Sequence, residues 1–256
     1  MRTRLYNLLI LSCLSGIAGC HKTDSFTGPF IEDYMPLHAG HSITYRLDSI
    51  VFTHFGTVWE QHSYIVKDSI ENAITDAAGR PSWRMVRYYR DANDATVWRP
   101  AGVSMITALP AAIELVENNL RYVKLSMPVQ DTRSWPGNSY LPFQPYGPVF
   151  DFSYSDHNQP SGWDYIYQDL HKADTINGLI FDNTITVACS TSDSSNFPPT
   201  DPTIRGYKTT WVEQYARGVG LVYKDVVLME YHLPNIQVPH SYYLGFELKM
   251  SIMAYQ

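Results

Sequence analysis

The residues whose types and spacing suggest chemistry are first of all histidines with polar neighbours. His38 and His41 lie three positions apart, a spacing at which two imidazoles can hold a metal ion. They precede the first expected strand and no third ligand is evident, so we predict no metal site. Asp169 and His171 alternate along an expected strand and would share one face. A carboxylate in that position can orient a histidine that acts as a base.

The sequence offers these groups no clear nucleophile. Ser104 lies in Gly-Val-Ser-Met-Ile, which lacks the second glycine of a hydrolase elbow. Glu114 and Glu117 have an odd spacing, so a strand would turn them to opposite faces and separate them as a glycosidase pair. We therefore predict a non-catalytic protein without a cofactor. A hydrolase that uses Asp169 and His171 on envelope or environmental polymers is the alternative.

A proline- and aromatic-rich segment, residues 128–162, interrupts the strand pattern. Its prolines are incompatible with a central strand or a regular helix, while its aromatic content is too high for a disordered linker. We expect an ordered insertion at the rim of a binding site, where rings stack on glycans or on apolar molecules. The alternative is that the rings only cap the open end of a barrel. The candidate ligand-binding residues are Trp135, Tyr140, Phe143 and Tyr146.

The three cysteines are expected to differ in chemistry. Arg2 and Arg4 precede a short apolar run that ends in Ile-Ala-Gly before Cys20, a pattern that resembles the bacterial lipobox. The resemblance implies that residues 1–19 are a lipoprotein signal peptide, removed together with Cys13, and that Cys20 is lipidated. Cys189 ends an apolar run, and we expect it to be buried and inert.

Charge and composition narrow the choice of partners. The chain carries 19 Lys and Arg against 25 Asp and Glu, a net charge of −6, which becomes −8 once Arg2 and Arg4 leave with the signal peptide. An acidic chain lacks the basic surface of a nucleic-acid binder, so we expect no nucleic-acid partner. Attachment to the membrane would depend on the lipid anchor. Residues 20–33 are expected to form a flexible tether. An acidic run directly after the lipidated cysteine can act as a signal for export to the cell surface in related bacteria. This chain lacks such a run after Cys20, which favours the periplasmic face of the outer membrane over the cell surface.

The remaining residues, 34–256, are expected to form a single β domain. Apolar residues alternate with polar ones over many short segments, most clearly from Leu244 to Ile252. Turn residues separate the segments, among them Asn118-Asn119 and Asn177-Gly178. Around Pro110 the strand pattern is least clear, and a short helix that starts there is the alternative. This pattern predicts an all-β fold: an antiparallel barrel, a half-barrel like that of bacterial lipoprotein carriers, or a sandwich.

Residues 211–231 are expected to form a hairpin that turns near Gly218, because Trp, Tyr and Val dominate both arms. Its Gly-Val-Gly is not a dinucleotide fingerprint, since Tyr223 replaces the third glycine. The run Trp-x-Glu-x-Tyr-Ala-x-Gly-Val-Gly-Leu-Val, from Trp211 to Val222, resembles one found in uncharacterised lipoproteins of Bacteroidota-type bacteria. So does the earlier Tyr-x-Pro-Leu-x-x-Gly-x-x-x-x-Tyr from Tyr34 to Tyr45. The resemblance implies a β fold and an envelope location, and no particular activity is attached to it. Apart from the membrane, we expect the partner to be a glycan or apolar ligand, or another envelope protein.

Overall fold

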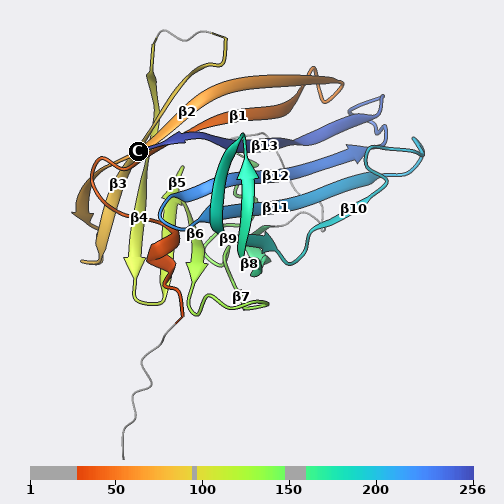
Figure 1. Ribbon diagram of the computed structural model, residues 1–256. Helices are drawn as coiled ribbons and strands as arrows, with labels where there is room; N and C mark the ends of the chain where they lie inside the picture. The colour runs from red at the N-terminus through yellow and green to blue at the C-terminus, as the bar shows by residue number, and fades with distance from the viewer. Residues whose placement is uncertain (1–27, 94–96, 148–159) are drawn as a thin grey trace, which may run out of the picture.

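A computed structural model describes residues 28–93, 97–147 and 160–256, and in these ranges nearly all regular structure is β-strand (Figure 1). The strands form one antiparallel sheet that curls into a nearly closed barrel. The neighbours run in the order β6-β5-β4-β3-β2-β1-β13-β12-β11-β9-β8-β7, and β10 pairs with β11 beside this path. The all-β prediction is confirmed. Of the three architectures that the sequence left open, the chain adopts the antiparallel barrel, which is nearly closed.

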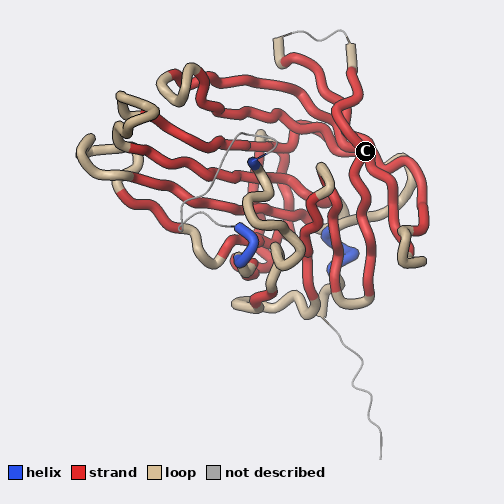
Figure 2. Tube along the Cα trace, turned by 180° about the vertical axis from the view of Figure 1, so that it is seen from behind, coloured by secondary structure: helices blue, strands red, loops and turns tan. Residues whose placement is uncertain are grey.

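Two short 3₁₀ turns lie in the described ranges, η1 (Ile31–Tyr34) and η2 (Pro160–Gly162) (Figure 2). The strands are β1 Ser42–Thr53, β2 Val58–Thr75, β3 Pro81–Asp91, β4 Arg99–Leu109, β5 Ala112–Glu117, β6 Leu120–Ser126, β7 Ser134–Trp135, β8 Tyr165–Ile176, β9 Leu179–Cys189, β10 Asp193–Ser195, β11 Gly206–Ala216, β12 Gly220–His232 and β13 Tyr242–Tyr255.

The two edges of the sheet meet at the proline-rich insertion. The Val123 N–H of β6 donates to the Gly137 carbonyl at 2.8 Å, just beyond β7. The Trp135 indole N–H returns a 2.8 Å hydrogen bond to the Val123 carbonyl. Figure 1 shows β6 and β7 side by side at this end of the molecule. The insertion thus joins β6, at one edge of the sheet, to the β7 end at the other edge. It covers backbone groups that an open edge would expose.

Most of the expected turns are confirmed. Asn118 and Asn119 both have positive φ, 53° and 62°, as a type I′ hairpin requires. Gly218 has φ 76° at the end of the β11–β12 hairpin. The helix considered near Pro110 is wrong, because Pro110 and Ala111 form the tight turn between β4 and β5. Strand β4 was not predicted, since its first half, Arg-Pro-Ala-Gly-Val, lacks the apolar alternation of a half-buried strand.

The alternation from Leu244 to Ile252 lies on β13 as expected. Phe246, Met250 and Ile252 are buried, and Leu244 and Leu248 pack against the same core. Packing on the inner face of the curled sheet divides into a large cluster with Trp211 at its centre and a smaller one around Ile252. A curled sheet buries its concave face because the two halves of that face cover each other.

Packed structure begins earlier than the sequence suggested. Residues 20–33 were expected to be a flexible tether, and those up to residue 27 lie outside the described ranges. Ile31 and Tyr34, however, are fully buried within η1, and the Gly218 N–H donates to the Asp33 carbonyl at 2.7 Å. An apolar residue fixed in the core cannot belong to a free tether, so the expected range is too long at its carboxyl end.

Candidate binding site

Six charged side chains point into the curled sheet rather than out of it. They come from six different strands and follow the period of two that sends alternate residues to one face. Charged groups are rare in a protein interior unless they are paired, so a set of this size marks a specialised region. The six are Asp68 on β2, Arg87 on β3, Glu117 on β5, Lys124 on β6, Glu213 on β11 and Lys224 on β12.

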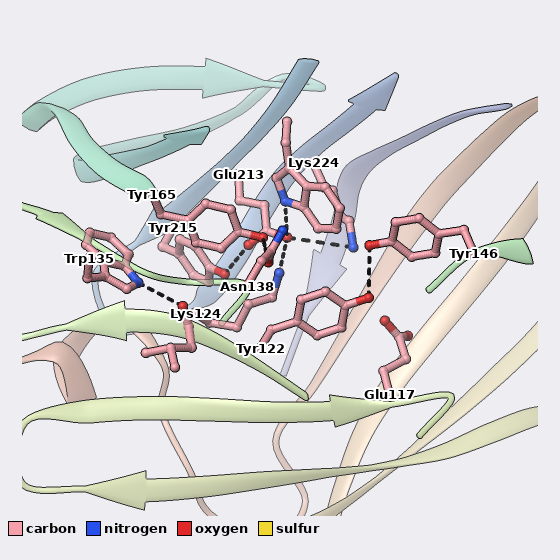
Figure 3. A network of polar contacts seen from close by, with 12 residues as sticks. Glu117, Tyr122, Lys124, Trp135, Asn138, Tyr146, Tyr165, Glu213, Tyr215 and Lys224 are labelled. Carbon is pink, nitrogen blue, oxygen red and sulfur yellow. Dashed lines mark hydrogen bonds and ion pairs between the residues drawn. The ribbon is translucent and has the colours of Figure 1, made fainter. Parts of the chain in front are cut away.

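Glu213 is the centre of the polar network in Figure 3. Its Oε1 accepts hydrogen bonds from Lys124 Nζ at 2.5 Å and from the Trp211 indole N–H at 3.2 Å. Its Oε2 accepts a hydrogen bond from the Tyr215 hydroxyl at 2.6 Å. Trp211, Glu213 and Tyr215 are alternate residues of one strand, so the Trp-x-Glu-x-Tyr pattern itself builds half of the network.

The environment keeps Glu213 ionised. Burial acts to raise the pKa of this carboxyl group, but the charges of Lys124 and Lys224 and the hydrogen bonds from Lys124 and Tyr215 outweigh it and hold the pKa at about 2. Burial lowers the pKa of Lys124, and Glu213 opposes that effect. A carboxylate with such a low pKa is a weak base, so the network is suited to holding charge in place rather than to moving protons.

A second ion cluster adjoins the first. Arg87 forms two hydrogen bonds with the carboxylate of Asp68, at 2.6 and 2.7 Å, and a third with Glu117 at 2.7 Å. Attraction to Arg87 lowers the pKa of Glu117 against the opposing effect of burial. For Arg87, burial favours the neutral form, but Asp68 and Glu117 prevail and raise its pKa. One guanidinium thus faces two carboxyl groups, those of Asp68 and Glu117.

Two cavities flank this charged region. One, of about 80 Å³, is walled mainly by apolar side chains of β1 to β5 and by the start of β12. The other, of about 110 Å³, lies on the side of Tyr122, Tyr146, Trp211 and Phe246. Four residues line both cavities: Arg87, Glu117, Lys224 and Met250. The interior thus offers apolar space on both sides of a fixed set of charges, which is the general form of a small-molecule site.

The four predicted ligand-binding residues do not form one surface. Trp135 and Tyr146 are buried, whereas Tyr140 and Phe143 are 57% and 68% exposed. Trp135 packs edge-on against Tyr165, and the Tyr146 hydroxyl lies 3.0 Å from that of Tyr122. Of the four, Tyr146 lines the larger of the two cavities described above, and the other three line neither. The structure therefore divides the set into two core rings and two rings on the surface of the insertion, while residues 148–159 lie outside the described ranges.

The arrangement expected for Asp169 and His171 is wrong. Both residues have left-handed backbone conformations, φ 50° and 57°, inside a bulge where β8 loses register with β9. Asp169 pairs with Lys172, and His171 Nδ1 lies 3.1 Å from the Tyr34 hydroxyl. A bulge re-aims the side chains within it, so strict alternation does not place these two on one face.

The other candidate catalytic groups are also engaged elsewhere. His41 Nδ1 and Nε2 lie 3.0 and 2.9 Å from the carbonyl oxygens of Gln256 and Val219, which leaves neither nitrogen for a metal. Glu114 pairs with Arg80 and Arg121 and lines neither cavity. Within the described ranges, no group of three or more His, Cys, Asp or Glu side chains could hold a metal ion.

Of the two cysteines expected in the mature chain, the structure describes Cys189 but not Cys20. Cys189 is buried and burial raises the pKa of its thiol, as expected for an inert residue. Cys20 lies outside the described ranges, so its lipidation stays a prediction. A search of the described part of the chain finds no helix that is both long and apolar enough to cross a membrane.

The fold and the site together define a class: a single curled antiparallel sheet with a small, charge-centred interior. No protein family model matches the chain, and no curated protein matches it. Among the solved structures similar to it are three that each share 12% identity with it. One is described as an exported protein with a YmcC-like fold from Bacteroides fragilis; the match covers 86% of this chain and 99% of that one, with a TM-score of 0.34.

The second structure is described as a lipoprotein from Parabacteroides distasonis, with 88% of this chain and 98% of that one covered and a TM-score of 0.35. The third is an outer membrane lipoprotein-sorting protein domain from Vibrio parahaemolyticus, with 85% of each chain covered and a TM-score of 0.21. Likenesses this distant assign no role to any residue of this chain. What can be said of its function depends on its own interior and its amino-terminal sequence.

Proposed function

We propose that the protein is a lipid-anchored, non-catalytic binding module of the bacterial envelope that holds a small molecule inside its curled sheet. The observation that carries the proposal is the pair of cavities around the charged network, which Arg87, Glu117, Lys224 and Met250 line in common. Binding sites combine apolar walls with a few fixed polar groups in this way. A plain structural core would fill such space with side chains, because voids cost stability.

The binding proposal is favoured over the hydrolase alternative by the state of the polar groups. Every oxygen of Glu213 already accepts a strong hydrogen bond, and its pKa of about 2 makes it a poor general base. Asp169 and His171, the pair on which a hydrolase would depend, have separate partners. A network whose central carboxylate is already fixed by its partners is suited to orienting a bound molecule, since no rearrangement of that carboxylate is required when the ligand arrives.

The test is to fill the interior. Met250 is buried and lines both cavities, so Met250→Trp should occupy the space and abolish binding of a small apolar probe such as 1-butanol, followed by NMR titration. Met253→Trp is the matched control, because Met253 lies three residues along β13 and is 46% exposed. If both variants fold and bind the probe as the wild type does, the cavities are not the binding site.

The envelope location has its own test. Cys20 follows Ile-Ala-Gly behind a short apolar run, so in a bacterial host it should be the first residue of the mature chain and carry the lipid. Mass spectrometry of the mature amino terminus should show the acylated cysteine, and Cys20→Ala should move the protein out of the membrane fraction. An unmodified chain that starts at another residue, or unchanged fractionation of the variant, would contradict the lipid anchor.

A further inference from the structure

Lys224 is the charged group of the interior that is least well satisfied by the protein. Its side chain is 14% exposed and lines both cavities. Its nearest anionic partner is Glu213 Oε1, at 3.6 Å from Nζ, which is too long for a hydrogen bond. No hydrogen bond to Lys224 is formed by the described residues, although an ammonium group has three donors to satisfy.

Lys124 shows what a satisfied lysine looks like in the same network. Only 4% of its side chain is exposed, and its Nζ lies 2.5 Å from Glu213 Oε1. The aromatic rings of Tyr122, Tyr165 and Trp211 surround that ammonium at 4.9 to 5.8 Å from their centroids. Lys224 shares one of these rings, since its Nζ lies 5.3 Å from the centroid of Trp211. The two lysines oppose the same carboxylate, but only Lys124 is bonded to it.

Lys224 cannot simply take over the existing acceptors. Glu213 Oε1 already accepts from Lys124 and Trp211, which fills the two lone pairs of that oxygen. Glu213 Oε2 accepts from Tyr215, and Glu117 pairs with Arg87. Leaving ammonium donors unpaired in a largely enclosed space costs free energy, so a partner that enters from the cavity would be favoured.

The walls around Lys224 indicate what else that partner contains. On one side lie Val226, Phe246 and Leu248, which line the larger cavity, and on the other lie Leu221 and Ile43, which line the smaller one. A dry apolar cavity of about 150 Å³ can hold a molecule the size of benzene, so cavities of this size suit only a short apolar group. The site therefore fits a compact molecule with one polar end.

We propose that the ligand is a small anionic amphiphile whose negatively charged head pairs with Lys224 while its short apolar body lies against Val226 and Phe246. The inference rests on the proposed function, because it assumes that the interior binds a ligand. An anion would give Lys224 the hydrogen-bonded partner that Glu213 and Glu117 cannot provide. Charge-assisted hydrogen bonds are about twice as strong as neutral ones, so the head should dominate the preference among ligands of equal length.

The experiment compares three four-carbon probes that differ only in their head: butanoate, 1-butanol and butylamine. NMR titration of the purified protein at pH 7 should show butanoate binding at least about tenfold more tightly than butanol, with butylamine the weakest. Lys224→Met should abolish the preference for butanoate and leave the affinity for butanol within about threefold. Lys249→Met, an exposed lysine on the outer face of β13, should keep the wild-type preference.

Two further measurements keep the proposal testable if Lys224→Met does not fold. Lys224→Arg should retain the preference for butanoate, because it keeps the charge. In the wild type, carbon-13 spectra of carboxyl-labelled butanoate should show that the bound head stays ionised to a lower pH than the free acid, since a nearby cation lowers a carboxyl pKa.

The outcomes separate the two proposals. Equal affinity for butanoate and butanol in the wild type would overturn the role of Lys224 and leave the cavity as a binding site. Failure of all three probes to bind the wild type would overturn the proposed function.

Discussion

At the scale of single residues, the interior depends on one carboxylate that serves several strands. Glu213 on β11 contacts Lys124 on β6 directly and Lys224 on β12 at longer range. Removing one partner from such a set leaves the others buried without compensation, which costs more than the set contributes when intact. The network is therefore sensitive to pH and to single substitutions.

The low pKa of Glu213 predicts loss of stability in acid. The pKa is lower in the folded chain, about 2, than the ordinary value of 4.5, so the unfolded chain binds the proton more readily. The stabilisation is complete above about pH 4.5 and is lost as the pH falls toward 2. Between about pH 4.5 and 2, the free energy of unfolding of Glu213→Gln should therefore fall by on the order of 3 kcal/mol less than that of the wild type. Urea titration at several pH values across this range measures the difference.

Glu247→Gln is the control for that experiment. Burial and the nearby Asp225 raise the pKa of Glu247, so this substitution should leave the acid-induced loss in place. Identical pH dependence of Glu213→Gln and the wild type would show that the carboxylate is not held ionised by its neighbours.

The aromatic residues of the insertion should separate into two groups. Trp135→Ala should cost about 3–5 kcal/mol of unfolding free energy, because the ring is buried and its indole N–H is bonded to Val123. Tyr140→Ala and Phe143→Ala should each change it by less than about 0.5 kcal/mol, since both rings are largely exposed. If the insertion is the rim of the site, the last two variants should lower ligand affinity while stability, followed by thermal melting, stays the same.

The sequence contained a signal for Glu213 but not for its partners. Alternate placement of Trp211, Glu213 and Tyr215 puts a carboxylate on the same face as two large rings, and that pattern indicates an inward-facing acid. Lys124 and Lys224 lie in strands whose sequences allow a lysine on either face. Which lysine meets which carboxylate depends on strand order, and a single sequence does not specify the neighbour of β6 or β12 across the barrel.

At the scale of elements, β13 is the strand whose register was clearest from sequence and is most central in the structure. It pairs with β1 on one side and β12 on the other, and its inner row packs against both core clusters. A slip of one residue would move that row to the outside. The period of two predicted the inward-facing residues of β13 correctly, because no bulge interrupts the run from Leu244 to Met250 in either pairing.

Phe246→Ala should therefore cost about 3–5 kcal/mol of unfolding free energy, because the ring is fully buried and packs edge-on against Tyr146. Met253→Ala, on the outer face of the same strand, should cost less than about 1 kcal/mol. Denaturant titration of the two variants measures the difference. Equal costs would mean that the inner and outer faces of β13 are assigned wrongly.

Bulges explain where element predictions failed. The sequence placed Asp169 and His171 on one face, and the irregular pairing between Gln168 and Lys172 removes that relation. Tertiary packing of Tyr34 against this region supplies a reason for the irregularity, since its hydroxyl contacts both His171 and Asn183. Such a contact between positions 34 and 171 is set by the fold and cannot be read from local alternation.

At the scale of the whole molecule, closure of the sheet depends on a small seam between the insertion and β6. Gly137 is essential to it, because a Cβ atom at this position would overlap the ring of Tyr165. Gly137→Ala should lower the melting temperature measurably, on the order of 2 kcal/mol or more in stability. Gly162→Ala, where a Cβ atom meets nothing within 4 Å, is the control and should be nearly neutral. A neutral Gly137→Ala would show that the seam does not hold the edges together.

The pairing of β1 with β13 has a consequence for how the chain reaches this structure. Ile43 is matched with Tyr255, so the centre of the sheet joins the first strand to the last. Contacts so distant along the chain raise the contact order. They slow folding because the entropy cost of closing a long loop comes before the stabilising contacts between β1 and β13 can form. A chain synthesised from its amino terminus would hold the free edge of β1 unpaired until β13 is complete, and an unpaired edge invites association with other chains. The completed pairing of β1 with β13 therefore removes an edge that is open to misassembly only while the chain is incomplete.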